Sequence, residues 1–321
     1  MIAYADRVAD AFDDVNRLIL DQLHSTVGLV EDISQYLVSA GGKRIRPRVT
    51  LLCAGALNAL TDSRQITLAA VIEFLHTATL LHDDVVDMST LRRGKPTANA
   101  NWGNASSVLV GDFVYSRAFE MMVSMGSLEV MSILSQTTTK IAEGEVQQLD
   151  NIAKLSMSED EYFAVIEKKT AQLFQGACES TAVLAGTPPE QRLALRSFGR
   201  HLGIAFQLID DYLDYQGDAS ALGKNVGDDL AEGKLTLPLI HALHQASDQD
   251  RQFLSDVIRE KNVSALPEVL ALVNSTGGLR RTVAAAQEHA EHAKQALTAL
   301  APSPHATALR QLVDTNLART S

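Results

Sequence analysis

Cysteine is nearly absent from this chain of 321 residues, which contains only Cys53 and Cys178. A fold that relies on a disulfide framework would need more cysteines, so that class is excluded. Both cysteines lie within apolar stretches that have helical periodicity. We therefore expect two reduced cysteines in the core of a cytosolic protein.

Excess positive charge and long apolar runs are also missing. The chain has 28 lysines and arginines against 39 aspartates and glutamates, so its net charge of −11 argues against a nucleic-acid binder. No stretch of about 18 uncharged apolar residues occurs, so we expect no stable membrane insertion. The first residues do not pair a charged segment with an apolar one, and we expect no signal peptide and a cytoplasmic location.

Residues with low helix propensity are scarce, with 8 prolines and 5% aromatic residues. No stretch shows the strong alternation of apolar and polar residues that is typical of a β-strand. A capping box at Ser158 and Glu161 starts one helix, which is expected to run to about Lys168 and to continue or restart at Thr170. Periodicity predicts the other helices over residues 3–23, 27–39, 47–60, 64–88, 104–125, 127–150, 170–185, 190–215 and parts of 236–318. Residues 92–103 and 217–233 are predicted to be loops. We predict one all-α domain over residues 1–321.

Three carboxylates crowd the end of the apolar helix over 64–88, in His82-Asp83-Asp84-Val85-Val86-Asp87. Asp83 and Asp87 share one helix face, with Cβ atoms about 6 Å apart. Such carboxylates repel each other unless a cation lies between them. Oxygen ligands without histidine or cysteine suit Mg²⁺, which carboxylates hold together with substrate phosphates. Arg92 and Arg93 follow and can bind the remaining phosphate oxygens.

The same spacing recurs at Asp210, Asp211 and Asp214, again after an apolar helical stretch. One such motif can be a solvated acidic helix end, but two in one chain indicate paired Mg²⁺ sites for a diphosphate-bearing substrate. A third acidic segment, Asp228–Glu232, is interpreted as loop and helix-cap residues.

These motifs resemble those of the trans-polyprenyl diphosphate synthases, and of the long-chain, octaprenyl-type members in particular. The resemblance extends from Gly41 to about Pro238. Its most specific segments are Gly41-Gly42-Lys43-Arg44-Ile45-Arg46-Pro47, Asp83–Asp87 with Arg92-Arg93-Gly94-Lys95-Pro96, Lys169-Thr170, and Phe206–Asp214 followed by Gly223-Lys224. It implies an antiparallel helix bundle of the isoprenoid synthase type around a deep central cavity, with both aspartate clusters at its mouth.

The resemblance also implies a reaction. Mg²⁺, as three ions in the full complex, grips the diphosphate of an allylic substrate, whose cation alkylates isopentenyl diphosphate without a protein nucleophile. The implied metal ligands are Asp83, Asp87 and Asp210. The residues implied at the allylic diphosphate and the reacting cation are Arg92, Lys169, Thr170 and Gln207, with Lys224 and Lys234 closing over them. The implied isopentenyl diphosphate pocket comprises Lys43, Arg46, His76 and Arg93.

Family membership further implies a homodimer and a quinone precursor as acceptor of the finished chain. One departure from the family pattern is Leu235, where a proline often follows the lysine that corresponds to Lys234. It affects the expected loop conformation and not the expected activity.

Product length is expected to depend on Ala78 and Thr79, five and four residues before Asp83. The growing chain should pass along this helix, where bulky aromatic side chains would stop elongation early. The small side chains predict a deep tunnel and a product of octaprenyl type.

Three other functions share parts of the pattern. A class I terpene cyclase needs an aromatic-lined cavity, whereas Trp102 is the only tryptophan. A metal phosphohydrolase that used His82-Asp83 would need several histidine ligands, and His76 lies on a different helix face from His82. A non-catalytic subunit of a prenyltransferase assembly would typically lack the aspartate clusters that this chain retains.

Overall fold

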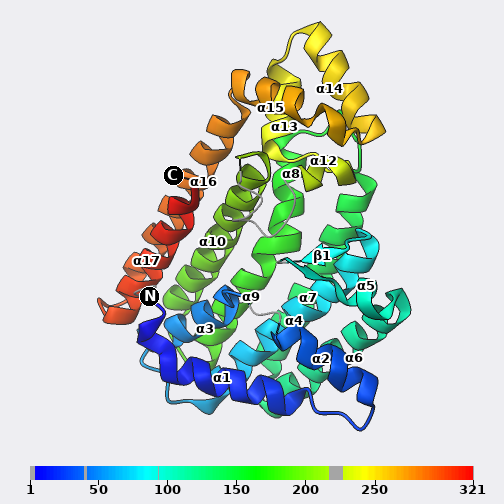
Figure 1. Cartoon of the computed structure of the whole chain (residues 1–321). Helices are drawn as coiled ribbons and strands as arrows, with labels where there is room; N and C mark the ends of the chain where they lie inside the picture. Colours follow the sequence, from blue (N-terminus) through cyan, green and yellow to red (C-terminus); the bar gives the residue numbers. More distant parts are fainter. Residues whose placement is uncertain (1–3, 40–41, 93, 217–226, 321) are drawn as a thin grey trace. The chain divides into compact units, whose positions relative to one another are not determined.

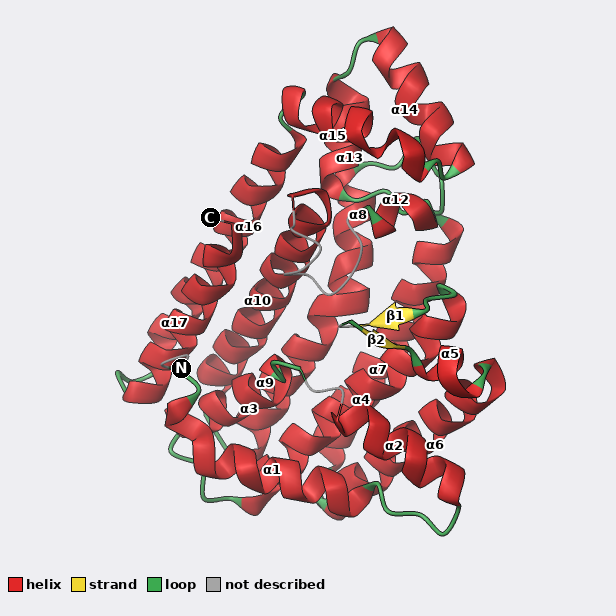
Figure 2. Cartoon of the chain, viewed as in Figure 1, coloured by secondary structure: helices red, strands yellow, loops and turns green. Residues whose placement is uncertain are grey.

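The computed structural model describes residues 4–39, 42–92, 94–216 and 227–320 (Figure 1). Almost all of the regular structure in these residues is helical, and their strands form one two-stranded sheet (Figure 2). The predicted all-α class is therefore confirmed. None of the described helices combines the length and apolar character that a membrane span requires. Gly41, Arg93, Gly223 and Lys224 lie outside the described residues.

The chain groups into two compact units. Unit 1 comprises Met1–Thr138, Leu173–Gly199 and Ala296–Leu312. Its elements are the 3₁₀ turn Asp6–Val8, α1 (Ala9–Gln22), α2 (Gly28–Ser39), α3 (Ile45–Ala56), α4 (Ser63–Val86), β1 (Leu91–Arg92), β2 (Lys95–Pro96), α5 (Ala98–Trp102), α6 (Asn104–Ser124), most of α9 (Gln172–Leu184), the 3₁₀ turn Leu297–Ala299 and parts of α7 (Leu128–Asp150), α10 (Pro189–Gln216) and α17 (Pro304–Leu317).

Helix α4 is the long buried helix of unit 1 and packs against α1, α3 and α6 (Figure 1). It begins at the N-cap Asp62, whose carboxylate accepts a hydrogen bond of 2.9 Å from the Arg64 N–H. Leu68, Ile72 and Leu75 are almost completely buried. This packing gives the aspartates at the end of α4 a rigid support.

The two cysteines lie in the core of unit 1, Cys53 on α3 and Cys178 on α9. Both thiols are free and fully buried, with Sγ atoms 3.8 Å apart. Burial raises the pKa of the Cys53 thiol well above its usual value. The prediction of two reduced core cysteines is therefore confirmed in the structure.

Residues 91–102 differ from the loop predicted over 92–103. β1 and β2 pair antiparallel, with Leu91 opposite Pro96, and α5 follows. Gly94 in the turn has a φ of 73°, which glycine adopts without strain. The loop prediction is wrong here because strands of two residues leave no alternation to detect. Helix α3 begins at Ile45, two residues before the predicted start at Pro47. Pro47 is compatible with the first turn of a helix, because backbone N–H groups in that turn have no partner within the helix.

Unit 2 comprises Thr139–Gln172, Arg200–Gln295 and Val313–Ser321. It contains the remaining parts of α7, α10 and α17. Its other elements are α8 (Glu159–Ile166), the π-helix Glu167–Ala171, α12 (Asp228–Glu232), α13 (Leu237–Gln245), α14 (Asp248–Glu260), the 3₁₀ turn Val263–Ala265, α15 (Leu266–Ser275), α16 (Gly278–Ala296) and the 3₁₀ turn Ala318–Thr320. Leu208, Ile240, Leu254 and Val273 belong to its continuous apolar core.

The predicted capping box starts α8. The Glu161 N–H donates to Ser158 Oγ at 3.2 Å, and the Ser158 N–H donates to Glu161 Oε2 at 2.9 Å. Beyond Ile166 the helix widens into the π-helix and continues as α9, which is one of the two outcomes predicted near Lys168. π-Helical turns are rare and often carry functional side chains, and this one carries Lys169 and Thr170.

Two histidines join α10 to α16 within unit 2. The Nδ1 atoms of His201 and His289 lie 2.9 Å apart. The pKa of His201 is lowered to about 4, mainly by burial and further by the His289 ring and Arg200. The pKa of His289 is also lowered to about 4, mainly by burial and further by Arg200 and His292. Both rings are therefore neutral at pH 7.

We expect this pair to make the metal-free protein less stable below pH 6.5. The unfolded chain binds these protons near the ordinary pKa of 6.5, and the folded chain only near 4, so the free energy of unfolding falls as the pH is lowered between those values. Allowing for solvent screening at two half-buried rings, we expect a loss of about 2 kcal/mol. Urea unfolding with EDTA at pH 7 and pH 5 measures it.

The matched control is the His201→Gln/His289→Gln variant. It keeps Asp211 and Asp214, whose raised pKa values contribute a pH dependence of opposite sign. The variant should lose less stability on acidification than the parent protein. An equal loss in both proteins would contradict the prediction.

Candidate active site

The first aspartate cluster lies at the C-terminal end of α4 in unit 1. Asp87 is the C-cap residue, and its N–H donates to the Asp83 carbonyl at 2.8 Å. Asp83 and Asp87 are thus one helical turn apart, as the sequence predicted, and both are partly exposed. Two carboxylates at this end of a helix also face the negative end of its dipole, which increases the benefit of a bound cation.

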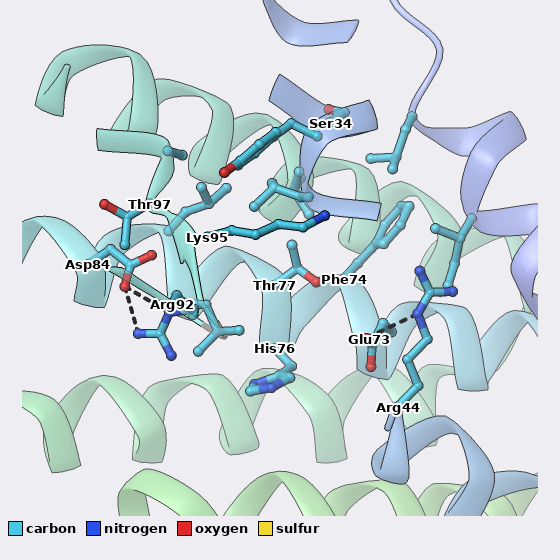
Figure 3. A pocket seen from close by; sticks show the side chains of 18 of the residues that line it. Ser34, Arg44, Glu73, Phe74, His76, Thr77, Asp84, Arg92, Lys95 and Thr97 are labelled. Carbon is cyan, nitrogen blue, oxygen red and sulfur yellow. Dashed lines mark hydrogen bonds and ion pairs between the residues drawn. The ribbon is translucent and has the colours of Figure 1, made fainter. Parts of the chain in front are cut away.

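Asp84 differs from its neighbours because it is buried, with 3% of its surface exposed. Arg92 binds its Oδ1 through Nη2 at 2.6 Å and Nε at 2.8 Å (Figure 3). The Asn99 amide donates to the Asp84 carbonyl at 3.1 Å. Arg92 has five N–H donors, so this contact orients the guanidinium and leaves donors for another anion.

A pocket of about 70 Å³ lies in unit 1 between α2, α4 and the β1–β2 hairpin (Figure 3). Its lining includes His76, Thr77 and Lys95. Ligand pockets typically exceed about 300 Å³, so this one is too small for a long isoprenoid. Ala78 and Thr79 are not among its lining residues, so the predicted chain-length position lies elsewhere on α4.

Two of the four residues predicted to bind isopentenyl diphosphate meet in unit 1. Arg46 Nη1 on α3 lies 3.1 Å from His76 Nε2 on α4. The Arg46 guanidinium also covers the Phe174 ring on α9, 4.6 Å from its centroid. Lys43 is exposed just before α3, and Arg93 lies outside the described residues. The ring contact and the histidine fix a guanidinium in place, which suits binding of a phosphate group.

The second aspartate cluster lies near the C-terminal end of α10 in unit 2. Asp210 is partly exposed, and its Oδ1 forms an ion pair of 2.8 Å with Arg319 Nη2. Asp211 is buried, with 4% of its surface exposed. Asp214 Oδ2 accepts a hydrogen bond of 3.3 Å from the N–H of Asp229, the second residue of α12. The acidic segment Asp228–Glu232, which the sequence indicated as loop and helix-cap residues, therefore lies against this cluster.

A chain of hydrogen bonds connects the π-helix to the second cluster. Thr170 Oγ1 donates to Gln207 Oε1 at 2.8 Å, and Gln207 Nε2 donates to Asp211 Oδ1 at 2.7 Å. The Tyr162 hydroxyl donates to the other oxygen of Asp211. These bonds explain how the Gln207 amide is accommodated in an apolar helical stretch. They also position the Thr170 oxygen, whose lone pairs stay available because the hydroxyl acts as donor.

The two predicted lysines of unit 2 that the structure describes are both in ion pairs. Lys169 Nζ lies 2.6 Å from Glu145 Oε2 and 2.6 Å from Gln148 Oε1, both on α7. Lys234 pairs with Glu232, and its N–H donates to the Asp229 carbonyl at 2.8 Å. Each ammonium is therefore held by a local carboxylate.

The buried carboxylates of the second cluster repel one another and Asp229. The pKa values of Asp211 and Asp214 are both raised to about 8, mainly by burial and further by the Asp229 carboxylate. Burial likewise raises the pKa of the Tyr162 and Tyr215 hydroxyls. A divalent cation would offset the repulsion, and the carboxylate-only donors of both clusters fit Mg²⁺.

Sequence reasoning missed several residues that contact the predicted site. Arg319 was missed because the last third of the sequence shows no motif, and a single arginine there gives no signal. Tyr162 had a weak signal, because a tyrosine in a buried helical position needs a partner for its hydroxyl. Glu145 and Gln148 face Lys169 from a helix whose polar positions look like ordinary surface.

Comparisons with known proteins agree with this chemistry. The polyprenyl synthetase family model matches residues 27–273. The chain is 51% identical over 296 residues to the octaprenyl diphosphate synthase of Escherichia coli K12, covering 92% of this chain and 91% of that protein. It is 46% identical over 305 residues to the all-trans-nonaprenyl-diphosphate synthase (geranyl-diphosphate specific) of Rhodobacter capsulatus, covering 95% and 94%.

Solved structures give the same result. The polyprenyl synthase from Caulobacter crescentus CB15, complexed with calcium and isoprenyl diphosphate, matches with a TM-score of 0.96 at 41% identity. The match covers 99% of this chain and 98% of that one. The chain therefore belongs to the polyprenyl synthetase family. It is an enzyme of the trans-polyprenyl diphosphate synthase type, as the sequence motifs indicated.

Proposed function

We propose that this enzyme elongates an allylic diphosphate by successive trans condensations with isopentenyl diphosphate and releases an all-trans product of octaprenyl type. The observation that carries this proposal is the pair of carboxylate-only clusters, Asp83–Asp87 and Asp210–Asp214, in a chain 51% identical to an octaprenyl diphosphate synthase. Retention of both clusters supports a catalytic chain over a non-catalytic subunit. The 5% aromatic content supports elongation over terpene cyclisation.

Asp83, Asp87 and Asp210 are the residues that would hold Mg²⁺, as three ions in the full complex. When bound, the metal supplies charge that neutralises the leaving diphosphate. Asp84 would act indirectly, by holding the Arg92 guanidinium 2.6 Å away and aimed at that diphosphate. Asp211 would act through Gln207, which it orients from 2.7 Å.

The remaining roles rest on the family resemblance. Arg92 and Lys169 bind the allylic diphosphate, and Lys224 and Lys234 close over it. Thr170 and Gln207 present oxygens to the developing cation, which costs no reorganisation because their mutual hydrogen bond of 2.8 Å already fixes them.

Isopentenyl diphosphate binds Lys43, Arg46, His76 and Arg93. The Arg46–His76 contact of 3.1 Å supports this assignment, because the two side chains could bind one phosphate group together. The proposal includes a homodimer and a quinone precursor as acceptor, which rest on the family resemblance. It also includes a cytoplasmic location, which rests on the two reduced cysteines. Light scattering on the purified protein tests the dimer.

The proposed function is tested by incubating the protein with MgCl₂, isopentenyl diphosphate and either farnesyl or geranyl diphosphate. Products are dephosphorylated and sized by chromatography. We expect one long product of octaprenyl type and complete loss of turnover with EDTA. A short product would reject the proposed chain length but keep the condensation. No product at any Mg²⁺ concentration would favour a non-catalytic subunit.

A further inference from the structure

Three histidines of unit 2 converge at a place that the proposed reaction does not use. His201 lies on α10, and His289 and His292 lie three residues apart on α16, so they share one helix face. One ring nitrogen from each lies within 4.8 Å of the others. The His201 and His289 Nδ1 atoms are 2.9 Å apart, and the His201 and His292 ring centroids are 4.9 Å apart.

This geometry suits a transition metal. Zn²⁺ binds histidine nitrogen at about 2.0–2.1 Å, so neighbouring ligands of a tetrahedral ion lie about 3.4 Å apart. The Nδ1 atoms of His201 and His289 lie 2.9 Å apart, and one nitrogen of each of the three rings lies within 4.8 Å of the others. Binding of the ion would therefore require the rings to move by up to about 1.4 Å toward one another. Imidazole nitrogen favours Zn²⁺, Co²⁺, Ni²⁺ or Cu²⁺ over Mg²⁺, so this cluster and the aspartates select different ions.

The protonation state also suits a metal. The Nδ1 atoms of His201 and His289 lie 2.9 Å apart, so one of these two nitrogens carries no proton and its ring is neutral, which is the form that coordinates metals. Their hydrogen bond uses one Nδ1 as donor and the other as acceptor. A metal bound to both Nδ1 atoms would require only that the donor ring move its proton to Nε2, with no net loss of a proton.

The neighbouring charges are largely balanced. Arg200 forms two hydrogen bonds with Glu167, at 2.7 Å and 2.6 Å. Arg281 pairs with Glu159 at 2.6 Å, so the positive groups nearest the rings each have a carboxylate partner. Glu167 offsets the repulsion that Arg200 exerts on a cation.

We propose that His201, His289 and His292 form a binding site for one first-row transition-metal cation of the Zn²⁺ type, separate from the Mg²⁺ clusters. The three nitrogens leave a fourth position for water. The ion would link α10 to α16 and stabilise unit 2. This assignment does not depend on the proposed prenyl transfer. The competing explanation is ring packing alone, because His289 also stacks on Phe163 with centroids 5.7 Å apart.

Titration with CoCl₂ of the untagged, EDTA-treated full-length protein tests the site. Millimolar MgCl₂ is kept present to occupy the carboxylate clusters. Tetrahedral Co²⁺ bound to nitrogen absorbs visible light much more strongly than octahedral Co²⁺ bound to oxygen, so the spectrum reports the ligand type. We expect one strongly absorbing ion per chain, displaced by ZnCl₂, and a melting temperature several degrees higher with either metal.

The decisive variant is His292→Ala, because His292 is exposed and its loss leaves the core intact. We expect its affinity for Co²⁺ to fall at least about tenfold and its metal-dependent rise in melting temperature to disappear. The matched control is His244→Ala, which removes an exposed histidine from α13 and should bind as the parent does. Binding that is unchanged in His292→Ala, or absent from the parent at high micromolar Co²⁺, would overturn the proposal.

Discussion

Replacing Asp83 with asparagine is expected to lower kcat for prenyl transfer on the order of 10³-fold at saturating substrate. The amide keeps the size of the side chain but removes the charge proposed to hold Mg²⁺. Asp83 is partly exposed at the end of α4, and its carbonyl still accepts the Asp87 N–H. Folding should therefore be unaffected, or slightly favoured by the loss of repulsion. Initial rates over a Mg²⁺ titration measure the effect.

Asp21→Asn is the matched control. Asp21 is exposed on α1 in the same unit and far along the chain from both clusters. It removes one negative charge without touching a proposed ligand, so activity should change less than twofold. A loss of less than about tenfold in Asp83→Asn, with folding intact by circular dichroism, would show that Asp83 is not a metal ligand.

Ala78→Phe is expected to change the product rather than the chemistry. Ala78 is fully buried on α4, five residues before Asp83. A phenylalanine there would fill the path proposed for the growing chain, so the main product should shorten from octaprenyl type to a few isoprene units. Overpacking should cost about 1–3 kcal/mol of stability. Chromatography of the dephosphorylated products, with farnesyl diphosphate as primer, measures the length.

Ala69→Phe separates a blocked tunnel from a damaged helix. Ala69 is also fully buried on α4 but nine residues earlier, about 180° around the helix. It should destabilise the protein by a similar amount and leave the product length unchanged. Equal shortening in both variants would attribute the effect to distortion of α4. Unchanged product in Ala78→Phe would reject this tunnel path.

The parts of the structure that could be predicted from sequence are those with a repeating or spaced signal. Asp83 and Asp87 were expected one helical turn apart because the apolar period before them is long and regular. The capping box at Ser158 and Glu161 was recognisable because both of its residues lie in one short segment.

The contacts that could not be predicted depend on the tertiary structure, which brings together residues that are far apart in the sequence. Nothing in the sequence indicates that Arg92 turns back to Asp84, because a two-residue strand pair positions it. The same holds for Arg319, which reaches Asp210 across more than a hundred residues of chain. The three histidines were not predicted as a site because His201 is separated from the other two by most of unit 2.

The π-helix between α8 and α9 makes the number of residues in this segment important. In an uninterrupted α-helix, Tyr162 and Lys169 would lie about 20° apart and face the same neighbour. Here Tyr162 reaches Asp211 on α10, whereas Lys169 reaches Glu145 on α7. One extra residue per turn lets a single helix serve two partners. Among related sequences, we therefore expect insertions and deletions within Glu167–Ala171 to be rarer than substitutions at its positions other than Lys169 and Thr170.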